Sequence, residues 1–185
     1  MDNKFASRGG EKLEHALGFF KINITDKICA DFGASTGGFT DCLLKHGAKK
    51  VYAVETGYGL LDWNLRNDEQ VIVMERTNAM HVKLPELMDF ISIDTSWTKQ
   101  KNILPTALIW LKPGGDIVSL LKPHYEAEKK HLRKGRVAEE FLEEIIDKVK
   151  MELANMNIIV KAITPSPITG KKGDNIEYLA YITKL

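Results

Sequence analysis

Apolar and polar residues follow two periods along this chain, short apolar runs typical of buried strands and longer stretches with the spacing of amphipathic helices. The first helical stretch covers residues 7 to about 19, and its predicted buried stripe consists of Leu13, Ala16, Leu17 and Phe20. Lys12 lies off that stripe, so its position alone predicts an exposed lysine. Further helices are expected at residues 39–46, within 58–65, at 102–111 and at 137–154.

Seven apolar runs have the length of strands, at residues 28–30, 51–54, 71–74, 90–93, 116–121, 157–163 and 176–182. Strands that alternate with helices predict an α/β fold, with a mostly parallel sheet covered by helices on both faces. Ligands of such sheets bind beyond the carboxyl ends of the strands. Charged residues stand at four of the predicted strand ends, namely Asp31, Glu55, Asp94 and Lys122. Four charged groups at one sheet edge indicate a functional site.

A glycine-rich turn follows the first strand, in Asp31-Phe-Gly-Ala-Ser-Thr-Gly-Gly-Phe39. Glycines there let the backbone approach a ligand closely, because no Cβ is in the way. Serine at position 35 breaks the G-x-G-x-x-G pattern of dinucleotide-binding folds, and the remaining spacing fits S-adenosylmethionine better than a pyrophosphate. Glu55 is placed to accept hydrogen bonds from ribose hydroxyls, and Asn78 follows the third strand, where an adenine would lie.

Length and composition predict one domain, residues 1–185, in a soluble cytoplasmic protein. The chain has 185 residues, 44% of them hydrophobic, without a secretory signal or an apolar run near the ~20 residues of a membrane helix. Cys29 and Cys42 have no metal or redox spacing and are expected to be packing residues in a reducing compartment. None of the five histidines has the spacing of a metal site, so no metal is expected.

Net charge is only +1, but residues 122–136 carry six lysines and arginines against two glutamates. This stretch is either a solvated surface or a basic face that follows phosphates. His124 and Tyr125, like Trp97, either stack on RNA bases or pack within their loops. Trp63 and Trp110 are expected in the core.

Several long stretches lie in order over nearly the whole chain: Ser7-Arg-Gly-Gly-Glu-Lys-Leu, the segment 31–44, Val51-Tyr-Ala-Val-Glu-Thr-Gly-Tyr-Gly, Glu75-Arg-Thr-Asn-Ala, Leu121-Lys-Pro and Thr164-Pro-Ser-Pro-Ile-Thr-Gly. Together they resemble the TlyA (hemolysin A) family, which belongs to the FtsJ-like ribosomal RNA methyltransferases. The resemblance implies a Rossmann-like methyltransferase fold with a seven-stranded sheet. It also implies transfer of a methyl group from S-adenosylmethionine to a ribose 2′-hydroxyl of ribosomal RNA.

The resemblance further implies a Lys-Asp-Lys-Glu catalytic tetrad, which falls on Lys12, Asp94, Lys122 and Glu177. The cofactor residues that it implies, together with those of the glycine turn, are Asp31, Gly33, Ser35, Thr36, Gly37, Gly38, Phe39, Glu55, Thr77, Asn78 and Asp94. Family members usually carry an N-terminal S4-type RNA-binding domain, which is expected to be absent from this chain. The loop 95–100 is more polar than is usual in the family.

A ribose hydroxyl is a poor nucleophile near neutral pH and must lose its proton as it attacks the methyl group. A lysine can accept that proton only when it is uncharged, which near neutral pH requires a pKa below the usual value of about 10.4. We hypothesise that Lys122 is this base and that Lys12 orients the hydroxyl. Asp94 would position Lys122 and the methyl donor, and Glu177 would hold Lys12.

Three other functions stay open from the sequence. A methyltransferase of the same fold could act on a small molecule, although the basic stretch 122–136 argues against it. A non-catalytic RNA-binding or ribosome-associated protein could keep the pocket, although the intact tetrad argues against that. A membrane-lytic protein is the remaining class, and the acidic face of the helix expected at 137–154 argues against it.

Overall fold

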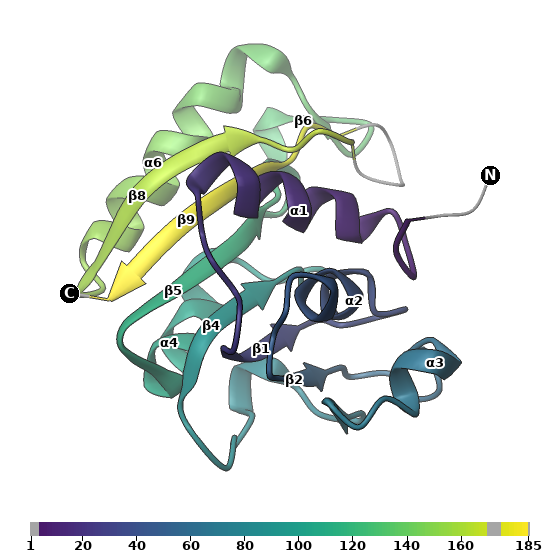
Figure 1. Cartoon of the computed structure of the whole chain (residues 1–185). Helices are drawn as coiled ribbons and strands as arrows, with labels where there is room; N and C mark the ends of the chain where they lie inside the picture. Colours follow the sequence, from purple (N-terminus) through teal and green to yellow (C-terminus); the bar gives the residue numbers. More distant parts are fainter. Residues whose placement is uncertain (1–3, 170–174, 185) are drawn as a thin grey trace.

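The computed structural model describes residues 4–169 and 175–184 and arranges them around one seven-stranded sheet (Figure 1). Its strands are β1 Ile28–Phe32, β2 Lys50–Val54, β3 Val71–Met74, β4 Met88–Ile93, β5 Leu111–Leu121, β8 Ile158–Pro165 and β9 Tyr178–Lys184. They stand in the order β3-β2-β1-β4-β5-β9-β8. Strands β1 to β5 are parallel, whereas β9 is antiparallel to both β5 and β8. The predicted α/β fold with a mostly parallel seven-stranded sheet is confirmed.

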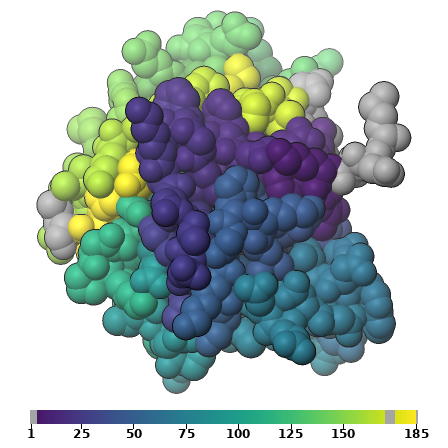
Figure 2. Space-filling view, viewed as in Figure 1, coloured from purple at the N-terminus to yellow at the C-terminus, as the bar shows by residue number. Residues whose placement is uncertain are grey.

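Helices cover both faces of this sheet. They are α1 Gly9–Phe20, α2 Gly38–Lys45, α3 Trp63–Arg66, α4 Gln100–Trp110, α5 Pro123–Glu126 and α6 Leu142–Ala154. Successive residues of a strand face opposite sides, and in β4 Phe90 packs with α1 and α2 while Ile91 packs with α4 and α6. Figure 2 shows α1 lying against α2 on one side of the molecule, in line with their contact.

Short elements fill the connection between α5 and α6. They are the 3₁₀ turns η2 Lys129–His131 and η3 Glu139–Phe141 and the two-stranded hairpin β6 Leu132–Arg133 and β7 Arg136–Val137. A third 3₁₀ turn, η1 Ala79–His81, follows β3. The prediction of one helix over 137–154 is therefore wrong at its start. Lys134 and Gly135 have positive φ values of 52° and 80°, which make a hairpin turn and leave the helix to begin at Leu142.

Two tryptophans are expected in the core, but they differ in exposure in the structure. Trp110 is partly buried, because its indole N–H donates to the carbonyl of Val82 at 2.9 Å and its ring packs against the core. Trp63 is 73% exposed, so the prediction for this residue is wrong. The reason is local: α3 has only four residues, and it turns Leu65 rather than Trp63 toward the interior.

Candidate active site

Two adjoining cavities open at the carboxyl ends of the parallel strands. The first, called the tetrad cavity here, is about 350 Å³ and is lined by all four members of the predicted tetrad. The second, called the Glu55 cavity, is about 450 Å³ and is lined by Glu55, Thr77 and Asn78. Gly33, Ser35, Asp94, Ser96 and Trp97 line both. Each cavity lies in the size range of small-molecule sites, roughly 300–1,000 Å³.

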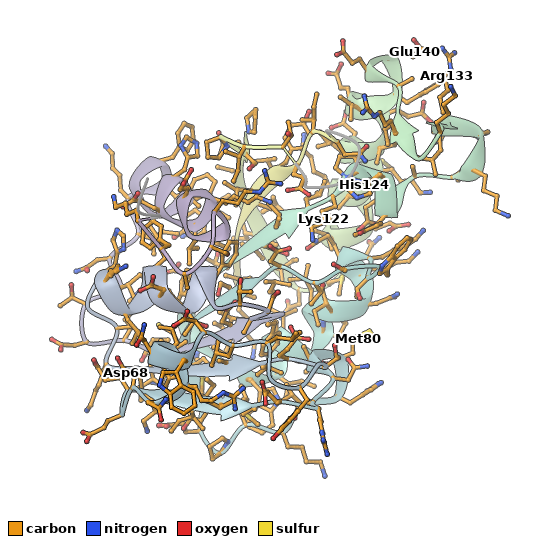
Figure 3. The ribbon with its side chains drawn as sticks, turned by 90° about the vertical axis from the view of Figure 1, so that its right-hand side faces the viewer. Asp68, Met80, Lys122, His124, Arg133 and Glu140 are labelled. Atoms are coloured by element: carbon orange, nitrogen blue, oxygen red, sulfur yellow. The ribbon has the colours of Figure 1, made fainter. Side chains whose placement is uncertain are left out.

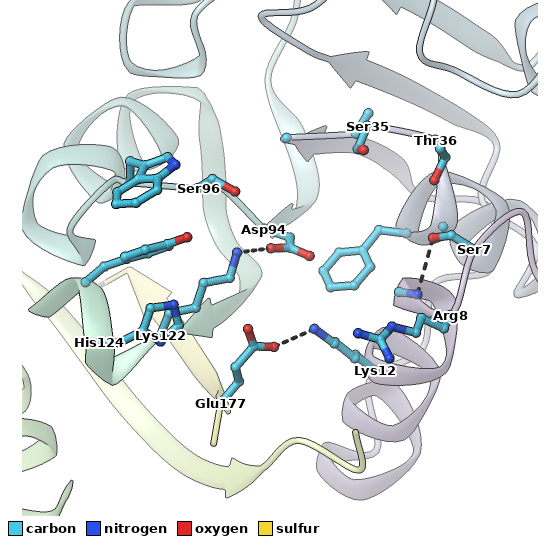
Figure 4. A pocket seen from close by; sticks show the side chains of 17 residues that line it. Ser7, Arg8, Lys12, Ser35, Thr36, Asp94, Ser96, Lys122, His124 and Glu177 are labelled. Carbon is cyan, nitrogen blue, oxygen red and sulfur yellow. Dashed lines mark hydrogen bonds and ion pairs between the residues drawn. The ribbon is translucent and has the colours of Figure 1, made fainter. Parts of the chain in front are cut away.

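Two lysine–carboxylate pairs face each other across the tetrad cavity (Figure 4). Lys12 Nζ lies 2.5 Å from Glu177 Oε2, and Lys122 Nζ lies 2.5 Å from Asp94 Oδ1. Lys122 also donates to the carbonyl of Thr95 at 3.2 Å. The four side chains come from α1, from the ends of β4 and β5 and from the start of β9, and the fold brings them together. Their catalytic roles stay a prediction.

Lys12 is buried, with 7% of its surface exposed, so the prediction from its position on the helix alone is wrong. α1 packs against β9, and Glu177 immediately precedes β9. The long side chain of Lys12 therefore reaches inward to a buried carboxylate instead of outward to solvent. A buried ammonium needs such a partner, because taking an uncompensated charge out of water is expensive.

The glycine turn after β1 packs tightly against its neighbours. Gly33 has a φ of 91°, and a Cβ on it would lie 2.4 Å from the carbonyl oxygen of Asp94. Gly37 has a φ of 94°, and a Cβ there would lie 2.3 Å from Leu65. Only glycine fits both positions without strain, so the turn passes directly beside the backbone of Asp94.

Glu55 and Asn78 present polar groups in the Glu55 cavity. The Glu55 carboxylate accepts hydrogen bonds from the backbone N–H of Ser35 at 2.9 Å and of Gly57 at 2.8 Å, which hold it in place. Asn78 Oδ1 accepts from the N–H of Met80 at 2.9 Å. Its amide nitrogen and the remaining lone pairs of Glu55 are the groups with which these residues can bind a ligand.

Of the other predicted cofactor residues, some line the cavities and some do not. Thr36, Gly38 and Phe39 line the tetrad cavity, whereas Asp31 and Gly37 are not among the lining residues of either cavity. Asp31 is fully buried under the turn and accepts hydrogen bonds from the hydroxyls of Thr40 at 2.8 Å and Ser92 at 3.1 Å. Burial raises the pKa of Asp31 to about 7, although both hydroxyl bonds oppose the rise.

Aromatic rings stand at the mouth of the tetrad cavity. The ring of Trp97 stacks on that of Tyr125 with 5.1 Å between centroids, and the Tyr125 ring lies 4.2 Å from that of His124. Trp97 is nevertheless 85% exposed. Burial lowers the pKa of His124, so its imidazole is more readily neutral. The rings thus pack on each other and still present a free aromatic face, and both predicted uses of these residues stay open.

The cations of residues 122–136 are interspersed with carboxylates. Lys130 lies 3.2 Å from Glu128, and Arg133 lies 3.4 Å from Glu140. Both pairs are exposed, and Figure 3 shows Arg133 and Glu140 together at one end of the molecule, beyond Lys122 and His124. The exposed cations of this stretch and the acidic side chains of η3 and α6 therefore form one surface of mixed charge.

Ser7 and Arg8 line the tetrad cavity, and no site role was predicted for either. Both stand in the Ser-Arg-Gly-Gly-Glu-Lys stretch that supplied Lys12. The signal for Arg8 was its separation of four residues from that lysine, which at the start of a helix places the two side chains on the same side. Arg8 is also the N-terminal flanking residue of α1.

Three further properties of the described residues concern metal ligands, cysteines and long apolar helices. In residues 4–169 and 175–184, no three His, Cys, Asp or Glu side chains form a group that could hold a metal ion. Cys29 and Cys42 are both buried and unpaired, as predicted for packing residues, and burial raises the pKa of the Cys29 thiol to about 12. Within the same ranges, no helix has both the length and the apolar character needed to span a bilayer.

Comparison with known proteins finds relatives over nearly the whole chain. The sequence model of the FtsJ-like methyltransferase family matches residues 5–184. The chain is 42% identical to the Bacillus subtilis protein named "Putative rRNA methyltransferase YqxC" and covers 66% of that protein with 97% of its own length. It is 38% identical to the Mycobacterium tuberculosis "16S/23S rRNA (cytidine-2′-O)-methyltransferase TlyA", with 98% of this chain and 69% of the relative aligned.

A solved structure has the same fold over the whole chain. It is titled "Putative hemolysin from Streptococcus thermophilus", is 40% identical and superposes with a TM-score of 0.95. The match covers 100% of this chain and 68% of that one. The chain thus spans about two thirds of the length of all three proteins.

Proposed function

This chain belongs to the FtsJ-like methyltransferase family, and on that premise we propose that it transfers a methyl group from S-adenosylmethionine to a ribose 2′-hydroxyl of ribosomal RNA. The family itself was predicted from the sequence motifs and is confirmed. The observation that carries the proposal is the convergence of two lysine–carboxylate pairs, one buried and one partly buried, on one cavity beside the glycine turn.

The residues of the Glu55 cavity fit S-adenosylmethionine. Glu55 supplies a fixed carboxylate for ribose hydroxyls, and Asn78 an amide for the adenine. Gly33 supplies a backbone without a side chain where the two cavities meet. When bound, the cofactor supplies an electrophilic methyl group on a sulfonium. Asp94 lines both cavities, so it is the carboxylate that connects the methyl donor to the tetrad.

The tetrad would orient and deprotonate the attacking hydroxyl. Lys122, as an uncharged amine, would take the hydroxyl proton as the ribose oxygen attacks the methyl group that the bound cofactor would supply, with the thioether as the leaving group. Asp94 holds Lys122 at 2.5 Å and Glu177 holds Lys12 at 2.5 Å, so neither amine is free to swing away. Lys12 donates to the ribose oxygen and aligns it. Methyl transfer is in-line, and such positioning contributes much of its rate.

The decisive experiment incubates the protein and labelled S-adenosylmethionine with ribosomal subunits and free RNA from cells that lack the protein, then maps the labelled nucleotide. We expect label on a ribose 2′-oxygen. Loss of a general base typically costs 10²- to 10⁴-fold, so Lys122→Ala should reduce transfer by about that factor and still bind the cofactor. Lys129→Ala, which removes an exposed lysine of η2, is the matched control and should stay within about twofold of wild type.

Each other outcome contradicts a different part of the proposal. Transfer by Lys122→Ala within a few-fold of wild type would mean that another group is the base. Cofactor binding by the wild type without transfer to RNA would favour a non-catalytic RNA-binding protein. Transfer to small metabolites alone would favour a small-molecule methyltransferase.

A further inference from the structure

We propose that Arg8 binds a phosphodiester group of the RNA, next to the ribose that is methylated. This inference rests on the proposed function and adds a substrate contact outside the tetrad. It starts from the charges around the tetrad cavity. The charged side chains among its lining residues are Arg8, Lys12, Lys122, Asp94 and Glu177.

These charges do not balance. Before Lys122 gives up its own proton for catalysis, each lysine is matched by a carboxylate at 2.5 Å, and the guanidinium of Arg8 is the charged group of the lining without a carboxylate beside it. Among the described residues Arg8 has no ion pair, and its one hydrogen bond runs from Nη2 to the carbonyl of Thr169 at 3.5 Å. That distance is beyond the usual range for N–H···O bonds. Most of the five donors of the guanidinium are therefore available to a ligand.

The backbone around Arg8 is closely packed, which fixes the Cα position from which the side chain of Arg8 extends. A Cβ on Gly10 would lie 2.3 Å from the ring of Phe5, and a Cβ on Gly38 would lie 2.3 Å from Ser7 Oγ. Ser7 Oγ also accepts from the N–H of Gly9 at 3.3 Å. The N-terminal segment thus packs against α2, and Arg8 stands four residues before Lys12, at the residue that flanks the start of α1.

The position of Arg8 favours the nucleic acid over the methyl donor as its ligand. Arg8 lines the tetrad cavity but not the Glu55 cavity, and Figure 4 shows it beside Lys12, on the side of the cavity away from Ser96 and His124. A ligand that enters the cavity on the side of Arg8 is the RNA, because the RNA carries the hydroxyl that reacts. The anionic group that Arg8 meets therefore belongs to the RNA. In RNA a phosphodiester is attached to the ribose carbon next to the one that bears the 2′-hydroxyl.

The chemistry of the side chain fits the same group. A guanidinium presents parallel N–H donors that match two phosphate oxygens, which a lysine ammonium cannot do. A phosphate contact positions the strand without reading its sequence. Arg8 is therefore a positioning residue that would hold the ribose between Lys12 and Lys122, and it would act equally on any nucleotide brought to the cavity.

The test compares Arg8→Ala with wild type in steady-state methyl transfer and in direct binding to the same RNA over a series of salt concentrations. We expect the KM for RNA to rise about tenfold while kcat changes by less than about threefold and cofactor affinity is unchanged. The slope of log K against log salt should fall by about 0.7 to 0.9, the value for one phosphate contact. Lys83→Ala is the matched control, because it removes one exposed positive charge near the amino-terminal end of β4.

A second variant separates charge from geometry. Arg8→Lys should keep the salt slope of wild type and still raise the KM for RNA, since it keeps one charge and loses the paired donors. An unchanged KM in both variants, or a loss of cofactor affinity with normal RNA binding, would overturn the inference. RNA binding does not depend on turnover, so a wild-type protein without transfer activity would contradict the proposed function while the salt slopes still decide the role of Arg8.

Discussion

Two regions of this molecule contain lysine or arginine next to carboxylates, and their surroundings differ. In the tetrad cavity the side chains of Lys12 and Glu177 are 9% and 5% exposed. On the hairpin and η3 the side chains of Arg133 and Glu140 are 77% and 60% exposed. Water screens the charges of the exposed pair almost completely. In the buried pair each charge has lost its hydration and has little except its partner to replace it.

This difference shows when charged residues in a sequence indicate a functional site. Residues 122–136 are the most conspicuous basic stretch of the sequence, yet their exposed cations lie among acids and contribute little energy as pairs. The lysines that converge on the cavity are Lys12, from a distant part of the chain, and Lys122, the first cation of that stretch, whose side chain is only 10% exposed. Burial, rather than the density of charge along the sequence, separates a site from a solvated surface here.

Breaking the buried pair should have the largest effect on stability. Glu177→Gln leaves the buried ammonium of Lys12 without a counter-charge, and removal of one partner of a buried pair typically costs about 3–5 kcal/mol. We expect a loss near 3 kcal/mol in the free energy of unfolding, because the amide oxygen still accepts one hydrogen bond. Chemical denaturation measures this as a lower midpoint with an unchanged m-value. A midpoint equal to that of wild type would mean that the pair is not buried in solution.

The buried carboxyl of Asp31 should make stability depend on pH. Its pKa is raised from 3.8 to about 7, so between these values the folded protein holds a proton that the unfolded chain has released. Stability must therefore fall as pH rises through this window and level off above it. From pH 5 to pH 8 this single group should cost roughly 2 to 3 kcal/mol, at 1.36 kcal/mol per pH unit.

Asp31→Asn removes this titration and keeps an oxygen for the hydroxyls of Thr40 and Ser92. We expect the free energy of unfolding of the variant, relative to wild type, to improve steadily between pH 5 and pH 8. All other titrating groups are common to the two proteins and cancel in the difference. Parallel stability curves over that range would show that Asp31 ionises in the folded protein as it does in water.

The exposed pair on the hairpin should respond least. Glu140→Gln removes the partner of Arg133, and double-mutant measurements on exposed pairs give about 0.2–1 kcal/mol at most. We expect a change below about 0.5 kcal/mol, which disappears at 1 M salt because screening then acts within about 3 Å. A change comparable to that of Glu177→Gln would remove the distinction between the two regions.

The class of fold, and the sheet edge where the candidate site lies, follow from the chain alone. Apolar runs alternating with amphipathic stretches are enough for a parallel sheet with covered faces, and strand ends such as Asp94 and Lys122 must then meet at one edge. The glycines at positions 33 and 37 are needed for a turn with positive φ, so that turn could also be located from the chain alone.

Which residues from other parts of the chain join that edge depends on how the helices and strands pack against one another. Glu177 precedes its strand, so in a parallel strand it would lie at the opposite edge of the sheet. The antiparallel pairing of Tyr178 with Leu121 places it beside Lys122. Lys12 is buried although it lies off the apolar stripe of α1, and Trp63 is exposed although it is apolar. Helical and strand periods describe how one element meets the core, and these residues depend instead on how separate elements meet each other.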